Sequence, residues 1–193
     1  MILITIAILI LVYVIYRLAI NNLIYVKSDI DNKIYQVQDL PDKKRASNIL
    51  ATINRNKDRL ISILKSNKNN EYSEYTQYID QLIKNSKNVV IRENVANSFY
   101  TSYSVNKGEE LVFCLRSKSR VNELHDINLL MYVVLHELAH IACPEYGHTE
   151  LFKKIFAFFI RVAIKNNMYT LIDFDRRPVE YCGMSISESI VRS

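Results

Sequence analysis

The apolar residues of this chain fall into successive patterns, and each pattern predicts a different kind of element. Residues 1–20 are almost uniformly apolar and carry no charge before Arg17. Residues 42–65 and 71–86 instead place apolar side chains at steps of three and four, which is the spacing of one helical face. Pro41 suits the start of the first of these two helices. The first half of the chain is therefore predicted to be helical.

Shorter apolar runs replace the helical spacing from residue 99 onward. Residues 99–105 and 110–116 are typical of strands, and Asn106-Lys-Gly-Glu109 between them is typical of a hairpin turn. A long apolar segment follows Asp126, a good N-cap residue, and stops before Pro144, which predicts a buried helix. A last apolar stripe at helical spacing predicts one more helix, which packs in the core: Leu151, Phe152, Ile155, Phe159 and Val162. Together these elements predict an α+β fold.

The buried helix carries the sequence His136-Glu137-Leu138-Ala139-His140, an H-E-x-x-H motif. Residues four apart lie on one helical face, so His136 and His140 can bind one zinc ion. Glu137 would lie beside that metal, where it can take a proton from an acidified water and pass it to a leaving amine. The motif is short, but an apolar helix does not readily bury two His and one Glu without a metal. The pattern predicts a zinc peptidase site.

A catalytic zinc usually has three protein ligands, and His148 is the predicted third. Pro144 and Gly147 can turn the chain back, so that His148 begins the next helix beside the first. His125 precedes the motif helix and is expected to be a surface or capping residue. Other candidates for the third ligand remain open: Glu145, Glu150, Glu180 and the thiolate of Cys143.

The motif and its surroundings resemble the WLM and SprT-like zinc metallopeptidases. The resemblance rests on H-E-x-x-H, a short loop, the run Gly147-His148-Thr-Glu-Leu-Phe152, and the strand-like segment Leu111–Arg116 before the helix. Over residues 110–189, including the tail Pro178–Met184, the chain is similar to WLM-type metallopeptidases of large DNA viruses. The resemblance implies a small zincin-like domain with a short antiparallel sheet, and a polypeptide substrate. It also implies a residue set: His136, His140 and His148 on zinc, with Glu137 as catalyst.

Two further features of the C-terminal half bear on peptide hydrolysis. Tyr181 could donate a hydrogen bond to the oxyanion that forms as water attacks. A packed tyrosine beside Cys182 and Gly183 explains the same sequence, and Glu188 is expected at the surface. If the strand 111–116 is an edge strand near the zinc, an extended substrate can pair with it.

The cysteines and the charges complete the predicted organisation. Cys114, Cys143 and Cys182 form an odd set with no paired spacing, which predicts no disulfide framework and a reducing compartment. Residues 27–92 hold 13 Lys and Arg against eight Asp and Glu, while the rest of the chain is balanced. This basic region could contact anionic lipid, although a solvated helical face explains it more simply. Nucleic-acid binding is not expected, because acidic residues are interspersed and no aromatic-basic module is present.

The apolar segment 1–20 is predicted to be a membrane anchor. With Arg17 at its edge it is about long enough to cross a hydrocarbon core of about 30 Å. It has neither the basic start nor the small-residue cleavage site of a signal peptide, and a buried core helix is the alternative. Lys and Arg follow this segment and none precede it, so the C-terminal domain is predicted to face the cytosol of a single-pass membrane protein.

The predicted organisation is thus a transmembrane anchor (1–20), a basic helical juxtamembrane region (21–95) and a zincin-like metallopeptidase domain (96–193). The predicted function is zinc-dependent hydrolysis of peptide bonds. The alternative is a catalytically silent zinc-binding or membrane-tethered interaction protein that keeps the fold. Glu137 argues against this alternative, because a structural zinc site needs no general base.

Overall fold

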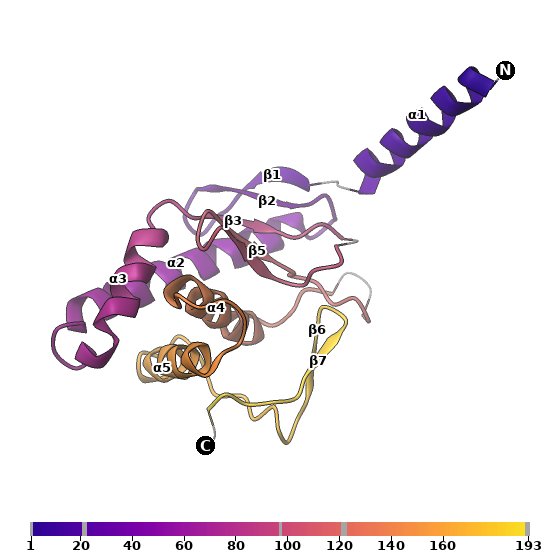
Figure 1. Ribbon diagram of the computed structural model, residues 1–193. Coiled ribbons are helices and arrows are strands. Elements are labelled where there is room, and N and C mark those ends of the chain that lie inside the picture. The colour runs from indigo at the N-terminus through magenta and orange to yellow at the C-terminus, as the bar shows by residue number, and fades with distance from the viewer. Residues whose placement is uncertain (1, 21–22, 97, 121–122, 192–193) are drawn as a thin grey trace.

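A computed structural model describes residues 2–20, 23–96, 98–120 and 123–191, and it has an α+β fold (Figure 1). Its main sheet has five strands in the order β1-β2-β3-β5-β4. β2, β3 and β5 run parallel, whereas β1 pairs antiparallel with β2 and β4 pairs antiparallel with β5. The strands are β1 (Leu23–Lys27), β2 (Ile34–Gln38), β3 (Val90–Glu93), β4 (Tyr103–Val105) and β5 (Glu110–Phe113).

The predicted short antiparallel sheet and the all-helical region before it are both wrong. β1, β2 and β3 come from the region predicted to be helical and build more than half of a mixed sheet. In β2 only the alternate residues Tyr35 and Val37 are buried, which is the period of a strand. This alternation covers only five residues, and the longer helical patterns beside it hid it. Residues 21–22 of the predicted region lie outside the described residues.

Both helices predicted within this region are present. The first is α2 (Lys43–Asn67), and the second is a 3-10 turn, η1 (Ser73–Tyr75), followed by α3 (Thr76–Asn85). α2 packs against β1, β2, β3 and α4, and α3 packs against α4. The apolar stripe of α2 faces this core and contains Ala46, Leu50, Ile53, Leu60 and Leu64.

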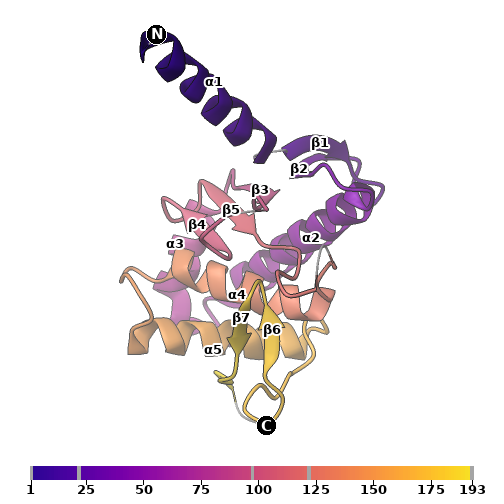
Figure 2. The same ribbon diagram turned by 90° about the vertical axis from the view of Figure 1, so that its right-hand side faces the viewer.

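The two helices that carry the motif form the next layers. α4 (Ile127–Ala142) lies between the sheet and α5 (Glu150–Lys165), as both views show (Figures 1 and 2). Asp126 caps α4 as predicted, because its side chain accepts a hydrogen bond of 2.8 Å from the Asn128 N–H. Most α4 side chains are buried, which explains why its sequence is apolar on all sides. A small hairpin, β6 (Val179–Tyr181) and β7 (Met184–Ile186), lies beside these layers.

The edge strand next to the motif helix is β4, not β5. β5 lies between β3 and β4, so the hypothesis that residues 111–116 form a free edge is wrong. The strand on its other side, β3, pairs with β5 in parallel, Val90 with Glu110 through Glu93 with Phe113, so the paired residues are 20 positions apart in the sequence. Such a pairing has no local sequence pattern, whereas the β4–β5 hairpin and its turn at residues 106–109 were predicted.

The predicted membrane anchor and the predicted single-pass location are wrong. The apolar segment forms the helix α1 (Ile2–Ile20). Within the described part of the chain, no helix is both long enough and apolar enough to cross a membrane. α1 has 19 residues, and at 1.5 Å per residue it spans about 28 Å, just under the ~30 Å of a hydrocarbon core. The predicted cytosolic orientation depended on the anchor and is withdrawn with it.

The cysteines also differ from the prediction. Cys114, just after β5, and Cys182, in the β6–β7 turn, form a disulfide with their Cα atoms 6.1 Å apart. Cys143 is the free cysteine of the described chain and is buried. The two bonded residues are separated by 68 positions, so their spacing gave no indication of the pairing. The disulfide fastens the small hairpin to the main sheet.

Candidate metal centre

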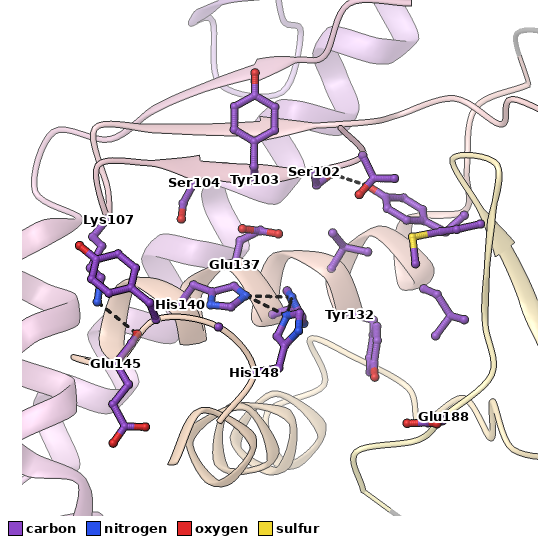
Figure 3. A pocket seen from close by; sticks show the side chains of 18 of the residues that line it. Ser102, Tyr103, Ser104, Lys107, Tyr132, Glu137, His140, Glu145, His148 and Glu188 are labelled. Carbon is purple, nitrogen blue, oxygen red and sulfur yellow. Dashed lines mark hydrogen bonds between the residues drawn. The ribbon is translucent and has the colours of Figure 1, made fainter. Parts of the chain in front are cut away.

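Three histidine side chains converge at the C-terminal end of α4 (Figure 3). The Nε2 atom of His136 lies 3.1 Å from that of His140 and 3.1 Å from that of His148. The Nε2 atoms of His140 and His148 are 3.2 Å apart. Two of these rings come from one face of α4, and the third comes from the loop just before Thr149, the N-cap of α5. The structure therefore brings together the three histidines that the sequence singled out.

The spacing of the three nitrogens fits a shared metal ion. A tetrahedral zinc with bonds of about 2.0–2.1 Å holds two nitrogen ligands roughly 3.3 Å apart, close to the observed separations. Within the described residues these histidines are the one group of His, Cys, Asp and Glu with such convergence. The other candidate ligands lie outside it: Glu150 pairs with Lys153, and Glu180 accepts a hydrogen bond of 2.6 Å from Ser117. The cluster can hold a metal ion, and zinc remains the predicted one.

The surroundings of the histidines favour their neutral form. Burial, reinforced by the neighbouring histidines, lowers the pKa of His136 to about 3. Burial likewise lowers the pKa of His140 to about 4, with smaller contributions from His148 and the positive charge of Lys107. Imidazole binds metal through an unprotonated nitrogen, so near neutral pH no proton must first be displaced from these two rings.

One buried ring, Phe152 of α5, supports all three histidines. It stacks on His140 with ring centroids 4.1 Å apart, and its centroid lies 5.0 Å from that of His136 and 4.9 Å from that of His148. The Phe152 N–H also donates to the Thr149 hydroxyl at the start of α5. This is the Phe that follows the third His by four residues in the resemblance, and its contacts give that spacing a physical reason.

Glu137 lies beside the histidines and points toward β4 (Figure 3). Its side chain is buried, and burial raises the pKa of its carboxyl to about 8, while a backbone hydrogen bond from Ser104 acts in the opposite direction. Ser104 lies on the edge strand β4 and lines the same cavity as Glu137, which places β4 beside the site. No positively charged side chain is among the causes of the Glu137 pKa shift.

The histidines and Glu137 line a cavity of about 990 Å³. One wall is formed by residues 101–107, which include β4, and the opposite wall by residues 184–188, which include β7. Neither wall was predicted from the sequence. Tyr132 was not predicted either, although it precedes His136 by one helical turn and that spacing could have indicated it. Glu188 is exposed, as expected, and also lines the cavity.

Tyr181 and His125 lie together, and Tyr181 is the one of the two that lines the cavity. Tyr181 is buried, its hydroxyl is hydrogen-bonded to the Ser102 hydroxyl, and burial raises its pKa. Tyr181 lines the cavity, and its predicted role toward an oxyanion stays a prediction. His125 is buried rather than exposed, which corrects the expectation of a surface residue. Its Nε2 accepts a hydrogen bond of 3.2 Å from the Cys182 N–H, and its ring centroid lies 5.0 Å from that of Tyr181.

Comparison with known proteins places the chain among viral relatives. It is 46% identical over 187 residues to the uncharacterized protein R325 of Acanthamoeba polyphaga mimivirus, an alignment covering 97% of this chain and 94% of that protein. The chain belongs to the same family as this viral protein. Two further viral proteins match shorter parts of the chain. Uncharacterized protein 136R of Invertebrate iridescent virus 6 is 39% identical over 56 residues, which cover 28% of this chain and 31% of that protein. Uncharacterized protein 042R of Invertebrate iridescent virus 3 is 35% identical over 85 residues, 43% of this chain and 50% of that protein.

No protein-family model matches the chain. Among solved structures, the crystal structure of Wss1 from Saccharomyces cerevisiae aligns with a TM-score of 0.43 and 19% identity, over 68% of this chain and 88% of that chain. A mutant of the same protein aligns with the same score and 18% identity.

Proposed function

We propose that the protein is a zinc-dependent metallopeptidase of the WLM type. The observation that carries the proposal is the position of Glu137. Its buried carboxyl lies next to three convergent histidines, below an open strand edge, in a cavity large enough for a peptide segment. A structural metal site has no use for such a carboxyl, because burying it without a charged partner destabilises the fold. A hydrolase does use it, as the group that moves the proton.

Glu137 would carry the proton through the reaction. His136, His140 and His148 would hold the zinc, which would supply Lewis-acid chemistry toward the peptide carbonyl and the attacking water. The Glu137 carboxylate accepts a proton from the attacking water and then gives it to the amide nitrogen, while a C–O bond forms and the C–N bond breaks. Burial raises the pKa of the Glu137 carboxyl to about 8 in the metal-free chain, and the positive charge of a bound zinc would lower that pKa toward the carboxylate that accepts the proton.

The edge strand β4 would hold the substrate. One side of β4 pairs with β5, and Ser104 of β4 lines the same cavity as Glu137, which supports a substrate position along its other side. An extended polypeptide that adds to this edge through backbone hydrogen bonds would lie along the cavity, over the histidines. Tyr181 would donate to the developing oxyanion; its raised pKa keeps the phenol protonated.

Metal content and proteolysis of the purified chain test the proposal together. Zinc would be measured by atomic emission, and cleavage would be followed on an unstructured protein such as casein. We expect zinc at one equivalent, cleavage by the wild type, and loss of cleavage with retained zinc in Glu137→Gln. Glu71→Gln, an exposed carboxylate paired with Lys165, is the matched control and should cleave normally.

The opposite result has a defined meaning. A zinc-loaded wild type that cleaves no faster than Glu137→Gln would show a catalytically silent zinc-binding protein. Contact of the basic segment 27–92 with anionic lipid is a separate proposal, supported by its charge. Flotation with phosphatidylserine vesicles tests it, and binding that ignores the anionic lipid fraction would contradict it.

A further inference from the structure

The loop that carries His148 is exposed, although its position decides whether the three histidines meet. Residues 144–148 are all exposed, and the Tyr146 side chain retains 85% of its accessible surface. Gly147 has a φ of +80°, a conformation that glycine adopts readily and most other residues do not. Burial therefore does not fix this segment, and contacts from elsewhere in the fold must do so.

Lys107, at the tip of the β4–β5 turn, supplies several such contacts (Figure 3). Its ammonium donates to the backbone carbonyls of Cys143 and Pro144, each at 2.8 Å, and of Glu145 at 3.3 Å. The same Nζ lies 4.2 Å from the centroid of the Tyr146 ring, over its face. Lys107 thus touches four consecutive residues between the second and the third histidine.

The carbonyls that Lys107 binds lie just beyond α4. Cys143 is the C-cap of the helix, and no following helical turn supplies N–H donors to residues 143–145. A lysine ammonium has three N–H donors, and here three carbonyls accept from it. No donor is left for a substrate oxyanion, so Lys107 acts on the loop and not on the reacting atoms.

The turn that presents Lys107 is itself tightly defined. Asn106, Lys107 and Gly108 all have positive φ, at 46°, 53° and 127°. A Cβ at Gly108 would lie 2.4 Å from the Asn85 carbonyl oxygen, so the turn lies directly against the end of α3. The ammonium therefore extends from a fixed point of the sheet to the loop.

We infer that Lys107 is the positioning residue of the metal centre, which holds the loop 143–147 so that His148 completes the ligand set. The inference rests on the proposed zinc site, and it adds a residue whose ammonium donates to the loop before His148 and is not itself a metal ligand. Outer residues that orient metal ligands typically contribute about 10–100-fold to metal affinity.

Zinc affinity, measured by competition with a chromophoric chelator, tests the inference. Lys107→Met keeps the apolar stem and removes the three donors, and we expect zinc to bind about 10–100-fold more weakly. Lys107→Arg keeps a charge and several donors and should recover most of the affinity. Lys44→Met is the matched control, because Lys44 also donates to a backbone carbonyl, that of Lys27, far along the chain from the histidine loop.

A second readout separates positioning from general stabilisation. The melting temperature of metal-free Lys107→Met should match that of metal-free Lys44→Met, and only the rise on adding zinc should be smaller. Wild-type zinc affinity in Lys107→Met would overturn the inference, as would an equal loss of stability with and without zinc. A wild type that binds zinc but cleaves nothing would refute the proposed peptidase and leave the assignment of Lys107 standing. A wild type that binds no zinc would overturn both.

Discussion

Replacing Glu137 by Gln should make the metal-free protein more stable, and increasingly so as the pH rises. The carboxyl has a pKa of about 8 in the folded chain, against 4.5 for an ordinary glutamate, and burial is the main cause. Below pH 4.5 the group is protonated in both states and contributes no difference. As the pH rises toward 8, the unfolded chain gains a solvated carboxylate that the folded chain resists. Stability is therefore lost across this window.

The size of the effect follows from the two pKa values. One pKa unit corresponds to 1.36 kcal/mol, so the penalty relative to a neutral side chain is about 1 kcal/mol at pH 5 and about 5 kcal/mol at pH 9. Glutamine has nearly the same shape and no charge, so Glu137→Gln should escape this penalty. The titrations of His136 and His140 occur in both proteins, and Glu137 is not among the causes of their pKa shifts. Their contributions therefore cancel in the difference.

Urea unfolding of both proteins, stripped of metal with a chelator, would measure this difference. The advantage of Glu137→Gln should grow by about 4 kcal/mol between pH 5 and pH 9. Glu71→Gln, whose parent carboxylate is exposed, should show a flat difference over the same range. A constant offset between wild type and Glu137→Gln would refute the argument, because it would mean that Glu137 ionises in the fold at an ordinary pH.

Three further substitutions probe other parts of the structure. His148→Ala should weaken zinc binding by more than about 100-fold, because it removes a ligand. The control is Glu150→Ala, a change at an exposed neighbour that should leave the zinc content unchanged. Full zinc content in His148→Ala would show that another residue completes the site. Cys182→Ser opens a disulfide whose residues are 68 positions apart. In urea unfolding, the free energy of unfolding should fall by about 4 kcal/mol, and adding reductant to the wild type should cause the same fall. Identical unfolding curves for the two proteins would mean that the bond does not form. Gly108→Ala places a Cβ 2.4 Å from the Asn85 carbonyl oxygen, at a φ of +127°. The free energy of unfolding should therefore fall by about 2 kcal/mol, and an unchanged stability would contradict the described turn.

The sequence predicted those parts of the fold that repeat a pattern over several turns or carry a defined cap. α2 was found because its apolar residues recur at helical spacing, and α4 was found because a long apolar segment follows the Asp126 cap. The strands β1 to β3 were missed because each has four or five residues, too few for alternation to stand out. The apolar composition of residues 1–20 predicted a membrane anchor, but no helix in the described chain is both long enough and apolar enough to cross a membrane.

The same division holds for the candidate site. His136, Glu137, His140 and His148 lie within 13 residues, so helix geometry and one turn are enough to bring them together. Lys107 approaches their loop from another element, and the turn that holds it was predicted while its contact was not. A tip residue contacts whatever the tertiary fold brings to it, and that information is not local.

The wall formed by residues 184–188 is fixed independently of the metal centre. Three links meet at its base: the disulfide from Cys182 to Cys114, the hydrogen bond from the Cys182 N–H to His125, and the hydrogen bond between Tyr181 and Ser102. All three fasten the hairpin to the chain around β4 and β5, and none involves α5 or the histidine loop. The width of the cavity is therefore set by the sheet and the hairpin, whereas the ligand geometry is set by α4, Phe152 and Lys107. Changes in the hairpin should consequently alter which substrates fit without altering how the metal is held.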